Sequence, residues 1–530
     1  MNKKVLVGDL VNGRPVHFPW VTGDTLIDPD GNVLGSSFGF FNNIFASVLF
    51  KDEIPTPTTT LTDSSAGALQ TAITAASAGD IILIDVDATY TPIQIPASKP
   101  LAIFVNTGRS VDIDATGVAY GILFKAGAEN IIIQGIEVHN QQGSNTPGCT
   151  DNAGGICQEA GIVKNVLLKD IDVYDCDEAG IQFQRMTAVT LSPTGPEDLS
   201  RNLYVVNCYC YNCSRVDSTE NGAIAFYDCR DVFVMGNRCT TSLRGVMCSN
   251  VVNGYVQGNK CYSNKYEGIK FDTVASTQYP SSTGTVCDNI VYGNGTVTPV
   301  AGIRADDMSG IVVMNNTVYN DAGDGIMIED DSDSTLVINN IVHSCAGTGI
   351  LTENSVDRIL VLNNISYNNT TADYSLGTGT PASISNLTVD PQLVNPGSGD
   401  FRPSDTSPAY FSGYENQVIG TTMYSWSWEN MWGANLVRLS VIAKQWLRDM
   451  FFDRTERSGV ASFAANTSLA ITFRYDLPSA DYRVMLQPLF DTTAAGAFWV
   501  TSKTASGFTI NFTNAATGDV DWFVESMGLS

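Results

Sequence analysis

The sequence predicts an all-β fold: a right-handed parallel β-helix solenoid followed by a small C-terminal antiparallel β domain. Three observations predict it. A two-part unit recurs from about residue 120 onward, apolar and polar residues alternate within it, and turn-forming residues are abundant, with 47 Gly among 530 residues. A single unit cannot bury its apolar face alone, so the copies must stack into a solenoid with a continuous core.

The first half of the unit is clearest in GIVVMNNTVYN at 310–320, STLVINNIVHS at 334–344 and RILVLNNISYN at 358–368. The paired Asn of each copy is expected at a bend, because Asn tolerates left-handed backbone. The next residue after each core position is aromatic or polar, so strand alternation points it outward. The aligned core positions are small or β-branched: Val138, Val173, Cys210, Cys239, Cys261, Val291, Val318, Val342 and Ser366.

The second half of the unit begins with Gly-Ile or a close variant, as in GIKF at 268, GIRA at 302 and GIMI at 325. It predicts a second short strand in each coil. An open solenoid end needs a cap against edge-to-edge pairing, and the amphipathic segment at 62–76 is expected to form a capping helix.

The predicted domain boundaries follow from changes in this rhythm. The solenoid is expected at 59–410, because a segment rich in Pro and Gly at 390–409 ends the repeat. Residues 1–58 are expected to be a capping segment or an attachment segment. A connector at 411–459 includes helical spacing of apolar residues over 432–452. Alternating apolar and polar residues predict a β-sandwich-like module at 460–530.

Composition argues against several classes of partner. Lys and Arg total 29 against 55 Asp and Glu, a net charge of −26, which should repel nucleic acid and anionic membranes. We find no apolar stretch of signal-peptide or membrane-spanning length. The 12 Cys recur at core positions, so we expect reduced, buried thiols. With only three His, serine-hydrolase and zinc chemistry are not expected.

Two segments carry a resemblance to a known family. The stretch DYRVMLQP at 481–488, with WVTSKTASGFTINFTNAATGDVDWFVE at 499–525, is similar to C-terminal modules of phage tail fibres. The segment DPQLV at 390–394, with GDFRPSDTSPA at 399–409, resembles the last coil of polysaccharide-acting β-helices. Together with the order of parts, they resemble bacteriophage tailspikes and tail fibres with a pectate-lyase-like β-helix.

That resemblance implies a homotrimer in the virion that acts at the host cell surface. Its ligand would be a bacterial surface polysaccharide such as a capsule, an exopolysaccharide or an O-antigen, and residues 1–58 would attach it to the phage tail or baseplate. We expect the chain to bind and depolymerise this glycan. A receptor-binding fibre that holds the glycan without cutting it, and a purely structural virion solenoid, are the alternatives.

The strongest candidate site is a column of carboxylates, four residues after the Gly of successive second halves: Asp272, Asp306, Glu329 and Glu353. Carboxylates stacked about 4.8 Å apart repel each other, which should raise one pKa while another group stays ionised. That division of labour suits glycoside hydrolysis. We expect Asp306 and Glu329, then Asp272, to be catalytic. Asp307 and Glu353 are expected to contact substrate.

Lys270 and Arg304 precede this column by two positions and should share its face. They are expected to bind substrate, and a uronic acid carboxylate would find counter-charges there. The pair therefore also supports polysaccharide elimination, with a Lys or Arg as the base. The remaining alternative is a salt-bridge ladder without a catalytic role.

Two further predictions concern ligands. The outward column includes Tyr262, Tyr292 and Tyr319, which are secondary candidates for stacking sugars. The acidic runs at 321–325 and 329–334 lack the spacing of an EF-hand loop, so they are expected to be solvated turns, with Ca²⁺ binding as the weaker alternative. We expect no cofactor and no dedicated metal site.

Overall fold

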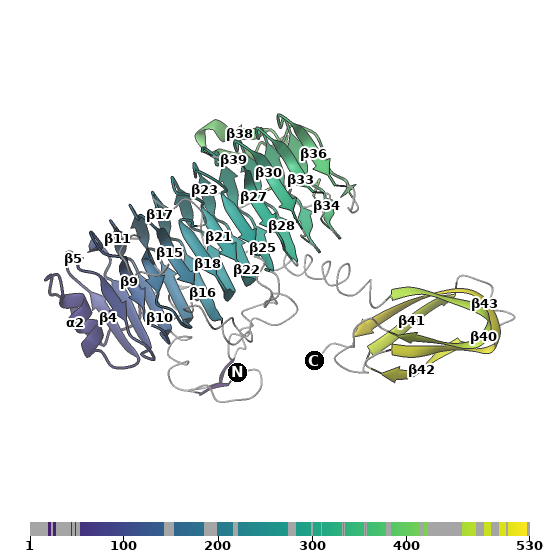
Figure 1. The fold of residues 1–530 in the computed structure, drawn as a ribbon, viewed down its shortest axis with the longest axis horizontal. Coiled ribbons are helices and arrows are strands. Elements are labelled where there is room, and N and C mark those ends of the chain that lie inside the picture. Colours follow the sequence, from purple (N-terminus) through teal and green to yellow (C-terminus); the bar gives the residue numbers. More distant parts are fainter. Residues whose placement is uncertain are drawn as a thin grey trace. The chain divides into compact units, whose positions relative to one another are not determined.

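The computed structural model describes two compact units, one with its described residues between 20 and 421, the other with its described residues between 458 and 526 (Figure 1). In the first unit the described residues are 20–22, 25–27, 44, 48 and 54–421, except 143–152, 185–198, 216–220, 274–281, 298–299, 309, 331, 333, 354–355, 357, 378–382, 411 and 414–417. In the second they are 458–472, 482–488, 498–504 and 507–526.

Three long parallel sheets make the first unit a parallel β-helix, as the sequence predicted. We call them sheets I, II and III. Sheet I has 13 strands. They are β3 (Thr59–Leu61), β4 (Asp80–Ile84), β7 (Leu101–Val105), β10 (Glu129–Gln134), β13 (Lys164–Lys169), β16 (Ser200–Val206), β19 (Cys229–Met235), β22 (Val252–Gln257), β25 (Gly284–Cys287), β28 (Ile311–Met314), β31 (Leu336–Ile338), β34 (Leu360–Leu362) and β37 (Ser383–Ile384).

Sheets II and III have 11 strands each. Sheet II contains β5 (Ala88–Tyr90), β8 (Val111–Asp114), β11 (Glu137–His139), β14 (Asp172–Tyr174), β17 (Tyr209–Tyr211), β20 (Arg238–Thr240), β23 (Lys260–Tyr262), β26 (Ile290–Tyr292), β29 (Thr317–Tyr319), β32 (Ile341–His343) and β35 (Ile365–Tyr367). Sheet III contains β6 (Ile93–Ile95), β9 (Tyr120–Phe124), β12 (Gly154–Gln158), β15 (Ala179–Gln184), β18 (Ile224–Tyr227), β21 (Val246–Ser249), β24 (Ile269–Asp272), β27 (Ala301–Asp306), β30 (Asp324–Glu329), β33 (Thr348–Thr352) and β36 (Ala372–Leu376).

Each coil therefore contributes three strands, whereas the sequence unit suggested two halves. The first half of the unit divides at its paired Asn, so that β28 and β29 belong to different sheets. Asn315, the first of its pair, has a φ of 54°, and Asn339 has a φ of 55°. Asn tolerates this left-handed backbone, and the bend falls where it was predicted.

The second Asn of each pair builds a ladder inside the solenoid. Asn316 donates from Nδ2 to Asn340 Oδ1 at 3.0 Å, and Asn340 donates in the same way to Asn364 at 3.0 Å. All three side chains are 0 % exposed. The ladder satisfies buried amide groups coil after coil, so these residues specify the bend rather than a ligand site.

The core follows the predicted register. Val138 pairs with Val173, Val173 with Cys210, and Cys210 with Cys239, and the column continues to Ser366. A Cβ on Gly302 would lie 2.7 Å from Val318 Cγ1, so Gly opens the second half because no side chain fits there. Eleven of the 12 Cys are described, and all eleven are buried free thiols, as predicted.

Both ends of the solenoid carry additional elements. The helix α2 (Ala68–Ala75) lies within the predicted 62–76 segment and packs Leu69 and Ile73 onto the core. After the last coils, β38 (Leu393–Asn395), the 3₁₀ helix η2 (Pro396–Ser398) and β39 (Asp400–Pro403) fold back. Ala409 and Ile419 then pack on Ile341 of sheet II. This segment covers the last coils of sheet II.

The second unit contains a four-stranded antiparallel sheet, in agreement with the predicted C-terminal β domain. Its strands are β40 (Ser458–Thr472), β41 (Tyr482–Pro488), β42 (Phe498–Thr504) and β43 (Gly507–Ser526). The helix predicted over 432–452 lies outside the described residues, and the domain boundaries stay predictions. The first unit also holds an antiparallel pair, β1 (Trp20–Thr22) with β2 (Thr25–Ile27).

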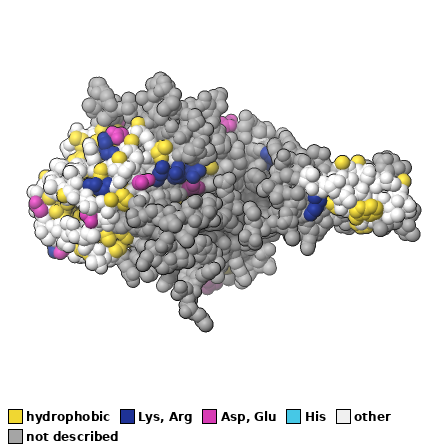
Figure 2. Space-filling model, turned by 90° about the horizontal axis from the view of Figure 1, so that it is seen from below, with side chains coloured by type: hydrophobic (Ala, Val, Ile, Leu, Met, Phe, Trp, Pro, Cys, Tyr) yellow, Lys and Arg dark blue, Asp and Glu magenta, His cyan; other side chains and the backbone are white. Residues whose placement is uncertain are grey.

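The described surface is not uniformly acidic. The register places Lys164, Arg201 and Arg230 on adjacent strands of sheet I, next to Glu129. Figure 2 shows a row of Lys and Arg side chains on one face of the molecule, with acidic side chains beside it. Among the described residues, none of the helices is long and apolar enough to span a membrane.

Candidate functional site

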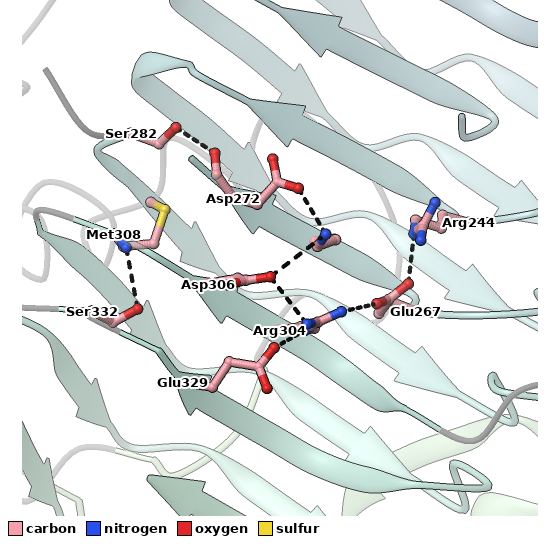
Figure 3. A network of polar contacts seen from close by, with 10 residues as sticks. Arg244, Glu267, Asp272, Ser282, Arg304, Asp306, Met308, Glu329 and Ser332 are labelled. Atoms are coloured by element: carbon pink, nitrogen blue, oxygen red, sulfur yellow. Dashed lines mark hydrogen bonds and ion pairs between the residues drawn. The ribbon is translucent and has the colours of Figure 1, made fainter. Parts of the chain in front are cut away.

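The predicted carboxylate column lies on sheet III. Asp272 at the end of β24 pairs in register with Asp306 of β27, and Asp306 pairs with Glu329 of β30. Lys270 pairs with Arg304 in the same sheet, two positions earlier. Figure 3 shows these side chains converging into one network. Sequence periodicity therefore predicted both columns and their common face correctly.

Two cations hold the carboxylates together. Lys270 Nζ lies 2.7 Å from Asp272 Oδ2 and 3.7 Å from Asp306 Oδ2. Arg304 donates from Nε to Glu329 Oε1, and its second terminal nitrogen lies 3.0 Å from Asp306 Oδ2. Each cation thus bridges carboxylates from two strands, which offsets the repulsion between stacked like charges.

A second ion pair lies behind Arg304 and was missed by the sequence analysis. Glu267 is 0 % exposed and lies between two arginines, 3.2 Å from Arg304 and 2.6 Å from Arg244. Arg244 and Glu267 each stand directly before the Gly that opens a second half, in successive units. Opposite charges at one repeat position were the signal that could have revealed this pair.

The acids of the network differ in the direction of their pKa shifts. Burial raises the pKa of Asp306 to about 7, against the opposing charges of Arg304 and Lys270. Burial also raises the pKa of Glu329, again opposed by Arg304. Burial by itself would raise the pKa of Glu267, but the charge and hydrogen bond of Arg244 outweigh it and lower that pKa. Near neutral pH, Asp306 is therefore the best placed of these acids to deliver a proton.

Asp272 differs from Asp306 in its access. Its Oδ2 contacts Lys270, while Oδ1 is buried and has no hydrogen-bond partner among the residues that the structure describes. The Ser282 hydroxyl donates to the Asp272 backbone carbonyl at 2.6 Å. The Asp306 side chain is 14 % exposed and that of Arg304 is 22 % exposed. Asp306 and Arg304 thus form the accessible edge, while the side chains of Glu329 and Asp272 are 8 % and 6 % exposed.

Two further predicted residues, Asp307 and Glu353, border the network. Asp307 follows Asp306, and Glu353 follows β33 and accepts a hydrogen bond from the Asp330 backbone at 3.5 Å. Asp306, Asp307 and Asp330 each offer a carboxylate oxygen within 4.8 Å of the others. Hard oxygen ligands of this kind suit Ca²⁺. Binding of Ca²⁺ here stays a prediction, and Asp331 and Asp333 of the acidic run lie outside the described residues.

The other acidic run, at 321–325, corrects an expectation. Asp321 is 2 % exposed and accepts a hydrogen bond from the Asn294 backbone at 2.6 Å, so it is not in a solvated turn. Burial raises its pKa to about 7. Asp324 belongs to β30, where its carboxylate accepts from the Thr348 backbone. Asp321 is buried inside the solenoid and Asp324 is half-buried at the start of β30, so neither carboxylate lies in a solvated turn.

Tyr262, Tyr292 and Tyr319 lie on sheet II, a different sheet from the charged network. Tyr262 stacks on Tyr292 with centroids 4.9 Å apart, and Arg238 covers its other side at 5.2 Å. Phe401 of β39 packs against both Tyr292 and Tyr319. Neighbouring side chains therefore occupy ring faces that were expected to stack sugars. The Tyr262 hydroxyl also accepts a hydrogen bond from Arg238 Nε at 2.6 Å, and a role of the three tyrosines in binding stays a prediction.

Comparisons with known proteins give the following similarities. A family model described as periplasmic copper-binding protein NosD matches residues 276–380, within the solenoid. No curated protein shows a significant match. The structure of pectate lyase Pel9A is similar at 12% identity and a TM-score of 0.46, covering 69% of this chain and 96% of that one.

Two other solved structures are also similar. The A-module of mannuronan C-5 epimerase AlgE4 from Azotobacter vinelandii has 11% identity and a TM-score of 0.44, covering 62% of this chain and 96% of that one. Tailspike protein 3 of bacteriophage CBA120 has 10% identity and a TM-score of 0.34, covering 63% of each chain. These neighbours are parallel β-helix proteins, and their names include polysaccharide-active enzymes and a tailspike.

Proposed function

We propose that this chain hydrolyses glycosidic bonds of a bacterial surface polysaccharide at the Asp306–Glu329 pair. One observation carries the proposal: Asp306 lies in register between two carboxylates, and its pKa is raised to about 7 by burial. A carboxyl group that keeps its proton near neutral pH is what a general acid in glycoside cleavage requires.

In this proposal each group has a role. Asp306 donates its proton to the glycosidic oxygen as the bond to the leaving sugar breaks. Glu329, on the adjacent strand and held by Arg304, is the second carboxylate. Adjacent strands lie about 4.8 Å apart, close to the roughly 5 Å between the carboxyl groups of retaining enzymes. Glu329 therefore attacks the anomeric carbon, and water later releases the sugar while Asp306 takes back a proton.

Elimination is the second candidate, since Lys270 and Arg304 pair in register on the same face. It needs a basic side chain that removes a proton from a uronate, and a positive group that neutralises the sugar carboxylate. Both cations already contact protein carboxylates, which favours hydrolysis. A fibre that binds the glycan without cleaving it is the non-enzymatic alternative.

We further propose that the protein is a phage tailspike, assembled as a homotrimer in the virion and acting at the host surface. The order of parts supports this proposal, because a long β-helix precedes a separate antiparallel module. Residues 1–58 would attach it to the tail. Light scattering that gives the mass of a monomer would contradict the trimer without affecting the proposed chemistry.

The first test uses purified capsular, exopolysaccharide and O-antigen preparations. Hydrolysis releases reducing ends without the ultraviolet absorbance of an unsaturated uronate, whereas elimination produces both. Because Asp306 must be protonated, we expect the rate to fall as the pH rises through about 7. Tight binding without reducing ends would support the non-enzymatic fibre, and unsaturated products would replace hydrolysis by elimination.

A further inference from the structure

The charged network also constrains which sugar it can accept. A uronic acid unit is normally held by Arg or Lys, through charge-assisted hydrogen bonds to its carboxylate. At this site the cations are Lys270, Arg304 and Arg244. Whether a uronate binds therefore depends on whether these side chains have donors left to offer.

Each of the three nitrogens of Arg304 already contacts a protein carboxylate. Its Nε donates to Glu329, one terminal nitrogen lies 3.2 Å from Glu267, and the other lies 3.0 Å from Asp306. Lys270 is 6 % exposed and contacts Asp272 and Asp306. Arg244 is also 6 % exposed and is paired with Glu267. Every cation of the network is thus already paired with a carboxylate of the protein.

The charge balance points the same way. The three cations face four carboxylates, those of Glu267, Asp272, Asp306 and Glu329. Further carboxylates, those of Asp307 and Asp330, lie within 4.8 Å of Asp306. With Asp306 protonated, as the proposed hydrolysis requires, three carboxylates balance the three cations, and Asp307 and Asp330 make the edge negative before an anionic sugar arrives.

Binding of a uronate would also disturb the proposed chemistry. To pair with Arg304, its carboxylate would compete with Asp306 and Glu329, which are the proton donor and its partner. Beside Arg304, the register continues with Met327 and then Leu351, both half-buried and uncharged. An apolar strip next to a proton donor suits the C–H face of an uncharged sugar ring.

From these contacts we infer that the sugar unit bound across Asp306 and Glu329 is uncharged, a neutral hexose or an N-acetylated sugar, and that uronate units are rejected there. The inference rests on the proposed hydrolysis and narrows its substrate class. It concerns the unit at the cleaved bond, so acidic units elsewhere along the polymer remain compatible with it.

The test presents each uronate-containing polysaccharide of the panel in two forms that differ only in charge. One is native, and in the other the uronic acids are reduced to neutral hexoses after carbodiimide activation. We expect the reduced form to be cleaved at least tenfold faster where a uronate flanks the scissile bond. Native polysaccharides are expected to be cut only next to uncharged units, as read by mass spectrometry of the products.

A variant sharpens the result. In the Asp307→Asn, Asp330→Asn double variant the edge is less negative, so the difference between native and reduced forms should shrink several-fold. Native forms cleaved as fast as their reduced partners, with uronate at the new reducing end, would overturn the inference and leave hydrolysis intact. A requirement for added Ca²⁺ to cleave at uronates would also overturn it. If no polysaccharide is cleaved in either form, the proposed function fails and the inference with it.

Discussion

Two columns of stacked carboxylates stand on different sheets of the solenoid. On sheet III, Asp272, Asp306 and Glu329 share Lys270 and Arg304. On sheet II, Asp112, Glu137 and Asp172 also pair in register. Among the described residues, the one ion-pair partner of this second column is His139, 3.1 Å from Asp112.

The neighbouring column explains the difference. Two positions away on sheet II the side chains are aromatic, and His139, Tyr174 and Tyr211 stack with centroids 5.1 and 4.8 Å apart. Burial raises the pKa of Asp172, and the charge of Glu137 adds to the effect. Burial and a neighbouring like charge therefore raise a pKa on sheet II as well, but interleaved cations are needed to hold several acids in one defined geometry. The comparison supports the proposal that the site lies on sheet III and not on sheet II.

The largest expected effect comes from a substitution in the carboxylate column of sheet III. In Asp306→Asn the proton donor is lost while the shape of the side chain is kept, so we expect initial rates of reducing-end release to fall at least about 100-fold. Glu137→Gln makes the matched change in the sheet II column and should leave the rate within about twofold. Similar losses in both variants, or none in Asp306→Asn, would contradict the assignment.

The next largest effect concerns Glu267, the buried carboxylate that pairs with both Arg244 and Arg304. Glu267→Gln leaves Arg244 and Arg304 without their shared buried counter-charge, and removing one partner of a buried ion pair costs about 3 kcal/mol or more. Urea unfolding of the purified chain, followed by circular dichroism, measures the change in the free energy of unfolding. An unchanged unfolding midpoint would show that Glu267 is not part of the structural support.

A smaller effect separates interior carboxylates from those of the site. The pKa of Asp321 is raised to about 7 from an ordinary value of 3.8, so its proton binds the folded state more tightly. This stabilisation is complete below about pH 4 and is lost as the pH rises to about 7. Asp321→Asn should therefore gain about 2 kcal/mol at pH 8, at roughly 1.4 kcal/mol per pKa unit with part of the gain offset, and little at pH 4. Thermal melting at both pH values tests this, and equal shifts would contradict it.

The smallest effect tests the carboxylate column of sheet II. Glu137→Gln removes a like charge between Asp112 and Asp172, so the melting temperature should rise slightly, corresponding to about 0.5 kcal/mol. The gain should shrink in 1 M salt, where the Debye length is about 3 Å. A loss of stability on this substitution would mean that the sheet II carboxylates are balanced by a bound cation after all.

The repeat was the most informative part of the sequence. Its period predicted the solenoid, the bend at Asn315, and the registers of Asp272 with Asp306 and of Lys270 with Arg304. These features are local or follow from stacking identical units. The third strand of each coil was missed, because the first half reads as one run and divides only at its left-handed Asn. The sheet II carboxylates were missed because they lie in less regular copies.

By itself, the sequence determined the all-β class, the position of each residue in its coil and the column in which it stands, since strand alternation and repeat length fix both. Only the tertiary structure decided which columns meet. It placed Tyr262 on another sheet, buried Asp321, and brought Glu267 and Arg244 behind Arg304. The reason is physical: side-chain direction and burial depend on how successive coils turn and pack, and pKa values depend on that burial.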